Sequence, residues 1–235
     1  MADFVIVGGG SAGCVLANRL SSAPGCQVVL LEAGGRDTSP FIRMPAGYLR
    51  LMETGQVDWG YHTVPQKHCY NRTFYWPRGK VLGGSSSING MVYVRGHPSD
   101  YDRWAQLGNR GWSYSDVLSY FKRAETWEGG ADAFRGGDGP LKTVGVESYH
   151  PFAQAWLTAG EQAGYPLTND INGANQEGFG TLQSTIADGR RASTAYCYLR
   201  PALSRPNLSV ITGALAKRVV IEGGRATGVE YIRNG

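Results

Sequence analysis

The sequence lacks three features that would each place it in a special class of protein. Its four cysteines show neither Cys-x-x-Cys spacing nor a histidine cluster, so we expect reduced thiols and no metal site. No apolar stretch approaches the ~20 residues that a membrane-spanning helix needs. The formal net charge of +4 is scattered, with no long basic run, which argues against nucleic-acid binding. These absences favour a cytoplasmic globular protein.

Glycine, in contrast, is abundant. It supplies 34 of the 235 residues, about twice the usual ~7%. The glycines follow no triplet period, which excludes collagen. Many fall in clusters, at Gly8-Gly9-Gly10, Gly34-Gly35, Gly83-Gly84, Gly129-Gly130 and Gly136-Gly137. Clustered glycine is typical of tight turns and of backbone that approaches a ligand closely.

The first 32 residues have the pattern of a strand, a helix and a second strand. Phe4–Val7 is a short apolar run, typical of a strand that is buried on both faces. From Ser11 to Leu20 apolar residues repeat at helical spacing, and Pro24-Gly25 ends that helix. A second apolar run, Val28–Leu31, ends at Glu32. The pattern predicts a βαβ unit and a Rossmann-like parallel sheet.

The loop between this strand and helix carries the motif Gly8-x-Gly10-x-x-Gly13, which we call the first glycine segment. Gly8 permits the tight turn, Gly10 lets the backbone approach a pyrophosphate, and Gly13 lets the helix pack closely on the strand. The helix N-terminus favours the negative charge of phosphate. Glu32 follows Gly13 at about the ~20 positions expected for a carboxylate that binds a ribose diol. The motif alone does not choose between FAD and NAD.

The rest of the chain predicts a mixture of helices and strands. Residues 35–77 show poor periodicity and predict an irregular excursion with short elements. Helices are expected over 99–125, in two pieces with Ser113 capping the second, and over 151–163 and 193–203. Strand-like runs cover 88–94, 178–186 and 209–212, and a β-hairpin covers 217–232.

A second glycine segment spans residues 79–96 and reads GKVLGGSSSINGMVYVRG. Its paired glycines and small hydroxyl residues let backbone N–H groups approach a flat or anionic group. A surface linker is the alternative, although linkers are not followed at once by an apolar run. The segment resembles the first sequence signature of the glucose–methanol–choline (GMC) oxidoreductases. It agrees with that signature at Gly79, Lys80, Leu82, Gly83, Gly84, Ser85, Ser86, Ile88, Asn89, Tyr93, Gly96 and Asp102.

The resemblance covers essentially the whole chain, and it is greatest to choline dehydrogenase-like and aliphatic alcohol dehydrogenase-like members of the family. It implies an α/β, Rossmann-like FAD-binding domain with the beginning of an α+β substrate-binding domain. The expected division places the FAD-binding domain at residues 1–150, the start of the substrate-binding domain at 151–203, and a return to the FAD-binding domain at 204–235. The implied activity is oxidation of the CH–OH group of a small alcohol, with hydride transfer to flavin N5.

The resemblance also implies which residues hold the cofactor. The pyrophosphate would lie against Gly8, Gly10, Ser11, Ala12 and Gly13. The adenosine ribose would contact Glu32 and Ala33, and the adenine edge Ala216. The flavin and ribityl chain would follow Val81, Gly83, Gly84, Ser85, Asn89, Gly90, Met91 and Val92. Some members attach flavin through a histidine where this chain has Ile88, so we expect non-covalent FAD.

The family's second signature and its active-site histidine have no match in these residues. We interpret His62, His68, His97 and His150 as surface or packing residues, since they lie in loop or turn contexts. No catalytic residue is therefore assigned, and we expect a fragment that is inactive alone. The alternatives are an inactive flavin-binding fragment, a GMC-family lyase or decarboxylase, and a nicotinamide enzyme.

The electron acceptor is expected to be oxygen or a quinone-type molecule, and membrane-associated members of the family raise peripheral membrane association as an alternative location. Three further features have two interpretations each. Trp59 either covers the flavin or is an ordinary buried aromatic residue. Arg78 and Arg95, at the two ends of the second glycine segment, either neutralise phosphate or form structural ion pairs. Arg190-Arg191 reads as a solvated turn charge rather than an anion site.

Overall fold

The computed structural model describes residues 2–146 and 150–233, and the chain forms two compact units. The first unit contains the residues up to Gly90 and those from Gly189 onward, and the second contains Met91–Asp188. The chain thus leaves the first unit once and returns to it. The division into functional segments at residues 150 and 203 stays a prediction, because the two units are defined by contacts alone.

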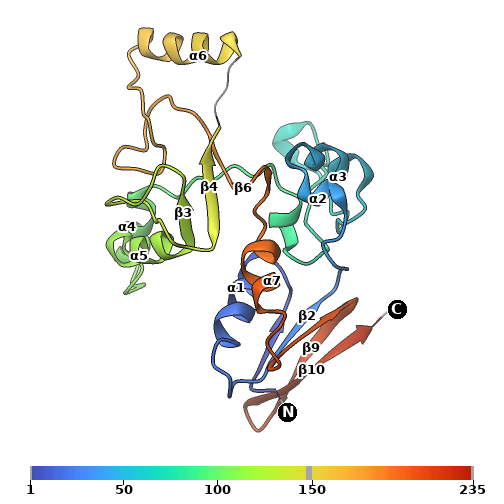
Figure 1. Cartoon of the computed structure of the whole chain (residues 1–235). Coiled ribbons are helices and arrows are strands. Elements are labelled where there is room, and N and C mark those ends of the chain that lie inside the picture. Colours follow the sequence, from blue (N-terminus) through green and yellow to red (C-terminus); the bar gives the residue numbers. More distant parts are fainter. Residues whose placement is uncertain (1, 147–149, 234–235) are drawn as a thin grey trace. The chain divides into compact units, whose positions relative to one another are not determined.

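The first unit is built on a three-stranded parallel sheet with the order β1-β2-β8 (Figure 1). Its strands are β1 (Phe4–Val7), β2 (Val28–Glu32) and β8 (Leu208–Thr212), in register so that Val29 lies beside both Val5 and Ser209. The helix α1 (Ser11–Leu20) joins β1 to β2. The predicted βαβ unit and the α/β fold class are confirmed.

The predicted burial of β1 on both faces is wrong. Only Ile6 is buried, whereas Phe4, Val5 and Val7 are 47%, 39% and 55% exposed. The reason is the position of β1 at an edge of the sheet, where β2 is its only partner among the described residues. By contrast, β2 lies between two strands and is almost wholly buried, so its apolar residues form the centre of the unit.

Short elements fill the predicted excursion over residues 35–77. They are α2 (Pro40–Arg43), η1 (Pro45–Gly47), α3 (Tyr48–Thr54) and η2 (Lys67–Cys69). Ile42 and Leu51 from these helices pack with Val81 and Ile88 in one buried cluster. This cluster anchors the second glycine segment, which forms the short helix η3 (Gly84–Ser87).

The remaining elements of the first unit follow Gly189, where the chain returns from the second unit. The strand β7 (Arg190–Arg191) precedes the helices η4 (Ala195–Leu199) and α7 (Arg200–Ala202), both of which pack against α1 (Figure 1). The predicted hairpin is confirmed as β9 (Ala214–Glu222) and β10 (Arg225–Arg233). The contacts of β9 with β2 place the start of the hairpin at the carboxyl end of the central strand.

The described residues of the second unit, 91–146 and 150–188, form three helices and short strands. Its helices are α4 (Pro98–Gln106), α5 (Tyr114–Ala124) and α6 (Pro151–Gln162), and its strands are β3 (Glu125–Trp127), β4 (Leu141–Gly145), β5 (Gln183–Ser184) and β6 (Ile186–Ala187). Ser113 caps α5 in a reciprocal arrangement with Asp116, as the sequence predicted. The strand predicted over 88–94 is wrong, because Met91 has a φ of 63° and only a single bridge, Val92 to Ser184, forms there.

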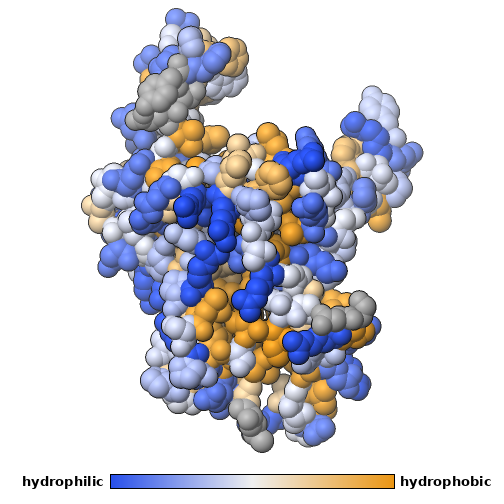
Figure 2. Space-filling model, turned by 45° about the vertical axis from the view of Figure 1, so that its right-hand side comes forward, coloured by the Kyte–Doolittle hydropathy of each residue, from blue (hydrophilic) through white to orange (hydrophobic). Residues whose placement is uncertain are grey.

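Large apolar side chains are exposed in both units, and hydrophobic patches are visible on the face drawn in Figure 2. On α6, Phe152 and Trp156 are 69% and 60% exposed, although their spacing had predicted one apolar face. Among the described residues, no helix has both the length and the apolar character required to cross a membrane.

A buried ionic network holds the second unit together. Glu125 is fully buried at the end of α5, and its carboxylate accepts hydrogen bonds from Arg95 at 2.8 Å and from Arg135 at 2.5 Å. Thr143 of β4 donates a third hydrogen bond at 2.7 Å. Arg135 is also fully buried and pairs with Asp170 at 2.7 Å. Because both guanidinium groups bind Glu125 and Arg135 also binds Asp170, the network links β3, β4, the loop before β4 and the segment around Asp170.

This network makes the stability of the second unit depend on Glu125. Burial alone would raise the pKa of the Glu125 carboxyl, but hydrogen bonds from Arg135 and Thr143 and the charge of Arg95 lower it below its usual value. A lowered pKa in the folded state means that the stabilisation is present at neutral pH and is lost as the pH falls through that pKa. The Glu125→Gln variant should lose about 3–5 kcal/mol of unfolding free energy at neutral pH.

Denaturant unfolding at several pH values measures this effect. The wild-type unfolding free energy should fall on acidification, and that of the Glu125→Gln variant should fall less. Glu161→Gln is the matched control, because Glu161 is exposed on α6 in the same unit and should be close to wild type. Equal stability of the Glu125 and Glu161 variants would contradict the assignment.

Candidate cofactor site

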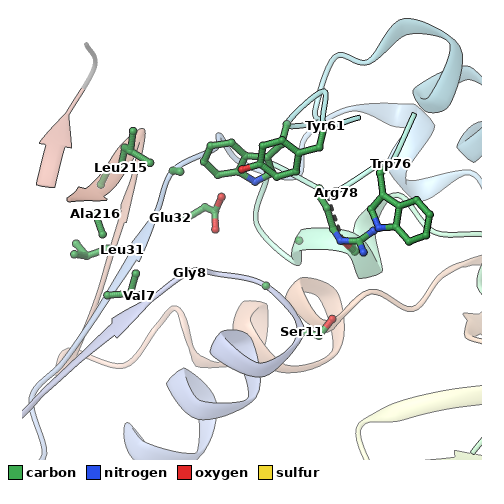
Figure 3. A pocket seen from close by; sticks show the side chains of 17 residues that line it. Val7, Gly8, Ser11, Leu31, Glu32, Tyr61, Trp76, Arg78, Leu215 and Ala216 are labelled. Carbon is green, nitrogen blue, oxygen red and sulfur yellow. Dashed lines mark hydrogen bonds between the residues drawn. The ribbon is translucent and has the colours of Figure 1, made fainter. Parts of the chain in front are cut away.

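A cavity of about 630 Å³ lies in the first unit at the carboxyl ends of β1 and β2 (Figure 3). Val7 and Gly8 end β1 at this cavity, and Leu31, Glu32 and Ala33 end β2 there. Open parallel sheets bind their ligands outside the carboxyl ends of the strands. The volume also falls in the range of ~300–1,000 Å³ typical of small-molecule and cofactor sites.

The first glycine segment forms the floor of the cavity between β1 and α1. The amide of Gly8 donates to the carbonyl of Leu31 at 2.8 Å, which ties the loop to β2. A Cβ atom at Gly13 would lie 1.9 Å from the Gly8 carbonyl oxygen, so only glycine allows α1 to start this close to the strand. Gly10, at the N-cap, has no side chain to accept from the first amides of α1. These amides are the anion-binding groups of a helix N-terminus.

Glu32 is a buried carboxylate that both lines the cavity and holds the loop. Its Oε2 atom accepts from the Gly9 amide at 2.7 Å, and its Oε1 atom accepts from the Gly34 amide at 2.7 Å. The residue is only 5% exposed. Because each carboxylate oxygen has two acceptor positions, Glu32 can also accept hydrogen bonds from ligand hydroxyl groups.

The structure brings the two glycine segments into direct contact. The Gly83 amide donates to the Gly9 carbonyl at 2.7 Å. Gly84 has a φ of 53°, and a Cβ atom there would lie 2.7 Å from the Gly10 Cα atom. The approach therefore requires glycine at position 84, whereas a Cβ atom at Gly10 would make only an ordinary contact with Gly84. Gly9 occupies a variable position of the motif, yet it contacts both Gly83 and Glu32, and the motif gave no signal for this role.

The predicted cofactor residues fall into three groups. Eight line the cavity: Gly8, Gly10, Ser11, Glu32, Ala33, Gly84, Ser85 and Ala216. Six others of the first unit do not line it: Ala12, Gly13, Val81, Gly83, Asn89 and Gly90. Met91 and Val92 belong to the second unit, so their role stays a prediction. Within the second group, Val81 is fully buried in the apolar cluster, where it anchors the second glycine segment.

Several lining residues were not among the predicted cofactor residues. They are Val7, Leu31, Trp59, Tyr61, Trp76, Arg78, Gly79, Ala214 and Leu215. Residues 58–79 form an irregular antiparallel ribbon, with bridges from Asp58 to Gly79 and from His62 to Tyr75. For two of these residues, Trp59 and Arg78, contact with the cofactor was one of the two interpretations raised from the sequence.

The ribbon presents aromatic rings and the Arg78 guanidinium group to the cavity (Figure 3). The rings of Trp59 and Tyr61 are stacked, with centroids 5.7 Å apart and planes 11° from parallel. The Lys80 ammonium group lies 4.7 Å from the Trp59 centroid, and the Arg78 guanidinium group lies 5.5 Å from the Trp76 centroid. Arg78 forms no ion pair among the described residues.

The first glycine segment lies beside a buried thiol, that of Cys14. Burial raises the pKa of the Cys14 thiol to about 11, so the thiol stays neutral and donates to the Gly9 carbonyl at 3.1 Å. The cavity is lined by no histidine of the described residues. The described residues also contain no group of three or more histidine, cysteine, aspartate or glutamate side chains arranged to hold a metal ion.

Comparison with known proteins decides the family. The sequence model of the GMC oxidoreductase family matches residues 2–235. The chain belongs to this family. The resemblance of the second glycine segment to the GMC signature is thereby confirmed, and the cavity at the carboxyl ends of β1 and β2 is a feature of a GMC chain.

Two curated relatives are named as choline dehydrogenases. The chain is 54% identical over 234 residues to oxygen-dependent choline dehydrogenase of Rhizobium johnstonii, covering 100% of this chain and 42% of the relative. It is 51% identical over 239 residues to mitochondrial choline dehydrogenase of Mus musculus, covering 99% and 40%. The chain thus spans about two fifths of the length of these relatives.

Solved structures of other oxidoreductases share the fold. Pyridoxine 4-oxidase from Mesorbium loti superimposes with a TM-score of 0.95 at 36% identity, covering 100% of this chain and 46% of that protein. Formate oxidase superimposes with a TM-score of 0.87 at 29% identity, covering 99% and 42%. The GMC chain therefore has the fold of these proteins along its whole length.

The close approach of α1 to β1 makes Gly13 sensitive to substitution. Gly13→Ala should lower the unfolding free energy by at least about 1–3 kcal/mol, because the added methyl group meets the Gly8 carbonyl and overpacks the turn. Gly25→Ala is the control, since a Cβ atom at Gly25 meets nothing within 4 Å. Thermal and denaturant unfolding compare the two variants, and a Gly13 variant as stable as the Gly25 variant would refute the packing role.

Proposed function

We propose that this protein is an FAD-dependent oxidoreductase acting on the CH–OH group of an alcohol, with hydride transfer to flavin N5. The observation that carries the proposal is the contact of the two glycine segments at the carboxyl-end cavity, through the Gly83 amide and the Gly9 carbonyl. FAD, when bound, supplies the electron chemistry, and the protein supplies position and electrostatics. Choline and pyridoxine, which appear in the names of relatives, each carry a CH–OH group.

The lining residues fit FAD on chemical grounds. The amides at Gly10 and Ser11 would hold the pyrophosphate, because the start of α1 has no side-chain cap to compete for them. Glu32 would accept from the adenosine ribose, and Ala216 on β9 would meet the adenine edge. Arg78 would neutralise part of the diphosphate charge, since it has no carboxylate partner of its own among the described residues.

The flavin end of the site is assigned to the second glycine segment. Gly84 and Ser85 line the cavity beside Gly10, so a ribityl chain extending from the pyrophosphate would follow them. Ile88 is 7% exposed and packs in the apolar cluster. An aliphatic side chain offers no nucleophile for a covalent link, so the FAD is proposed to be non-covalent.

The proton acceptor for the alcohol hydroxyl is not assigned within these 235 residues, because no described histidine lines the cavity. A base supplied by further sequence, of the kind that the longer relatives have room for, would complete the site. The absence of histidine from the described lining of the cavity also favours a second candidate function, that of a flavin-binding fragment without activity.

Anaerobic mixing with alcohols distinguishes these functions. Oxidised flavin typically absorbs at about 450 nm. The full-length gene product, loaded with FAD, should lose this absorption when choline or another primary alcohol is added. The 235-residue chain by itself should show no such bleaching. Acid precipitation should release the FAD into the supernatant.

Three results would contradict the proposal in different ways. A protein that binds NAD and no flavin would refute the flavin assignment. A yellow full-length protein that no alcohol bleaches would favour the inactive module or a lyase or decarboxylase of the same family. Flavin that remains with the acid-precipitated protein would refute non-covalent binding.

Glu32 provides a test of the cofactor site that does not depend on turnover. Glu32→Ala removes the acceptor for two loop amides and for the ribose, so the Kd for FAD should rise about 10- to 100-fold, as expected for hydrogen bonds to a charged group. Glu32→Gln retains an acceptor oxygen and should be intermediate. Fluorescence titration of the apoprotein measures both.

Glu53→Ala is the matched control for these variants, because Glu53 is exposed on α3 and, within the part of the chain that the structure describes, pairs only with Arg50 on the same helix. It should bind FAD as the wild type does. If Glu32→Ala and Glu53→Ala gave the same Kd, the ribose and loop-holding role of Glu32 would be excluded.

A further inference from the structure

Arg190 and Arg191 are neighbours in β7 with opposite environments. Arg190 is exposed, as a solvated turn charge should be, whereas Arg191 is only 2% exposed. The interpretation of the pair as solvated is therefore wrong for Arg191. Its side chain enters the first unit and does not line the candidate cofactor cavity.

The Arg191 guanidinium group connects two distant segments of the chain. Its Nε atom donates to the carbonyl of Ile42 at 2.9 Å, near the end of α2. Its Nη1 atom donates to the carbonyl of Asn89 and to the Asn89 Oδ1 atom, both at 2.7 Å, with a longer contact of 3.3 Å to the Ser86 carbonyl. The second glycine segment is thus held at Ser86 and Asn89 by a residue about a hundred positions away.

Packing alone does not account for an arginine at this position. No carboxylate forms an ion pair with Arg191 among the described residues, and its Nη2 atom is buried without a hydrogen-bond partner. Burial lowers the pKa of Arg191 to about 10, which still leaves it charged at neutral pH. A buried charge compensated only by carbonyl groups is costly. An apolar side chain would avoid that cost, so the arginine points to a requirement for its hydrogen bonds.

Ser86, which Arg191 contacts, is connected to the cavity by further hydrogen bonds. The Ser86 hydroxyl donates to the Gly83 carbonyl at 2.6 Å and accepts from the Thr194 amide at 3.0 Å. Gly83 and Gly84 then contact the first glycine segment. Residues 191–194 therefore fix the second glycine segment at Gly83, Ser86 and Asn89. The Asn89 amide is also oriented, because its oxygen is committed to Arg191.

We propose that Arg191 is a positioning residue for the cofactor. Its guanidinium fixes the backbone from Ser86 to Asn89 and the orientation of the Asn89 side chain, so that the second glycine segment is already in its binding geometry before FAD arrives. The inference rests on the proposed function, since it requires a flavin against this segment. Pre-organisation of this kind raises affinity by reducing the ordering that binding requires.

The test uses the full-length gene product with three substitutions. Arg191→Met removes the hydrogen bonds and the charge, Arg191→Lys keeps the charge without the planar fork, and Arg190→Met removes a neighbouring exposed charge as the matched control. The measurements are the Kd for FAD, the visible circular dichroism of the flavin at saturating FAD, and the unfolding temperature of the apoprotein.

The expected result is a Kd about 10- to 100-fold higher for Arg191→Met, with an altered flavin dichroism at saturation. Arg191→Lys should be intermediate in both, and Arg190→Met should match the wild type. Wild-type Kd and dichroism in Arg191→Met would overturn the inference. A purely structural role, with a lower unfolding temperature but unchanged flavin dichroism at saturation, would overturn it as well.

Two outcomes separate this inference from the proposed function. If Arg191→Met does not fold, Arg191→Lys is the variant that tests the inference. Wild-type Kd and dichroism in the folded lysine variant would overturn the positioning role.

If the wild-type protein itself takes up no FAD, the proposed function fails first. If the wild type binds FAD and the Arg191 variants have the same Kd and dichroism, the proposed function is unaffected. Only the positioning role of Arg191 is then refuted.

Discussion

The contact between the backbones of the two glycine segments is the constraint on which the rest of the first unit depends. Gly9 donates its amide to Glu32 and accepts from the Gly83 amide, each at 2.7 Å, and also accepts from the Cys14 thiol. A side chain at Gly9 would come within 2.9 Å of Leu82. One residue thus joins the end of β2, the start of α1 and the second glycine segment. The cavity exists because three elements converge on backbone that has no side chains to separate them.

Buried charges stabilise the two units in different ways. Glu125 in the second unit is surrounded by two guanidinium groups and a hydroxyl group, so its charge is fully compensated. Glu32 is compensated by two backbone amides instead, which leaves acceptor positions for a ligand. Arg191 is compensated only by carbonyl and amide oxygens, and one of its nitrogen atoms has no partner. The paired charge of Glu125 thus differs from Glu32 and Arg191, which have no oppositely charged partner among the described residues and for which we propose roles in binding the cofactor.

The parts of the fold that local pattern dictates could be predicted from the sequence. The run Phe4–Val7, the helical spacing from Ser11 and the second run ending at Glu32 each specify their element through a period of apolar residues, and the structure has β1, α1 and β2 there. The exposure of β1 could not be predicted, because a strand's neighbours are set by distant sequence. Similarly, the run from 88 to 94 is apolar enough for a strand, but the φ of Met91 and the lack of a continuous partner prevent one.

The candidate site shows the same division between local and distant information. The positions of Gly8, Gly10 and Glu32 at the cavity were predictable, because they follow from one loop and one strand end. Arg191 was not, since a pair of adjacent arginines before a short helix reads as solvent-exposed, and only the folded chain shows that one of them reaches Ile42 and Asn89. A motif therefore identifies the surface that faces a ligand more readily than the residues that hold this surface in place. Those supporting residues are dispersed in the sequence, and the physical sign that reveals them is an incompletely compensated charge inside the protein.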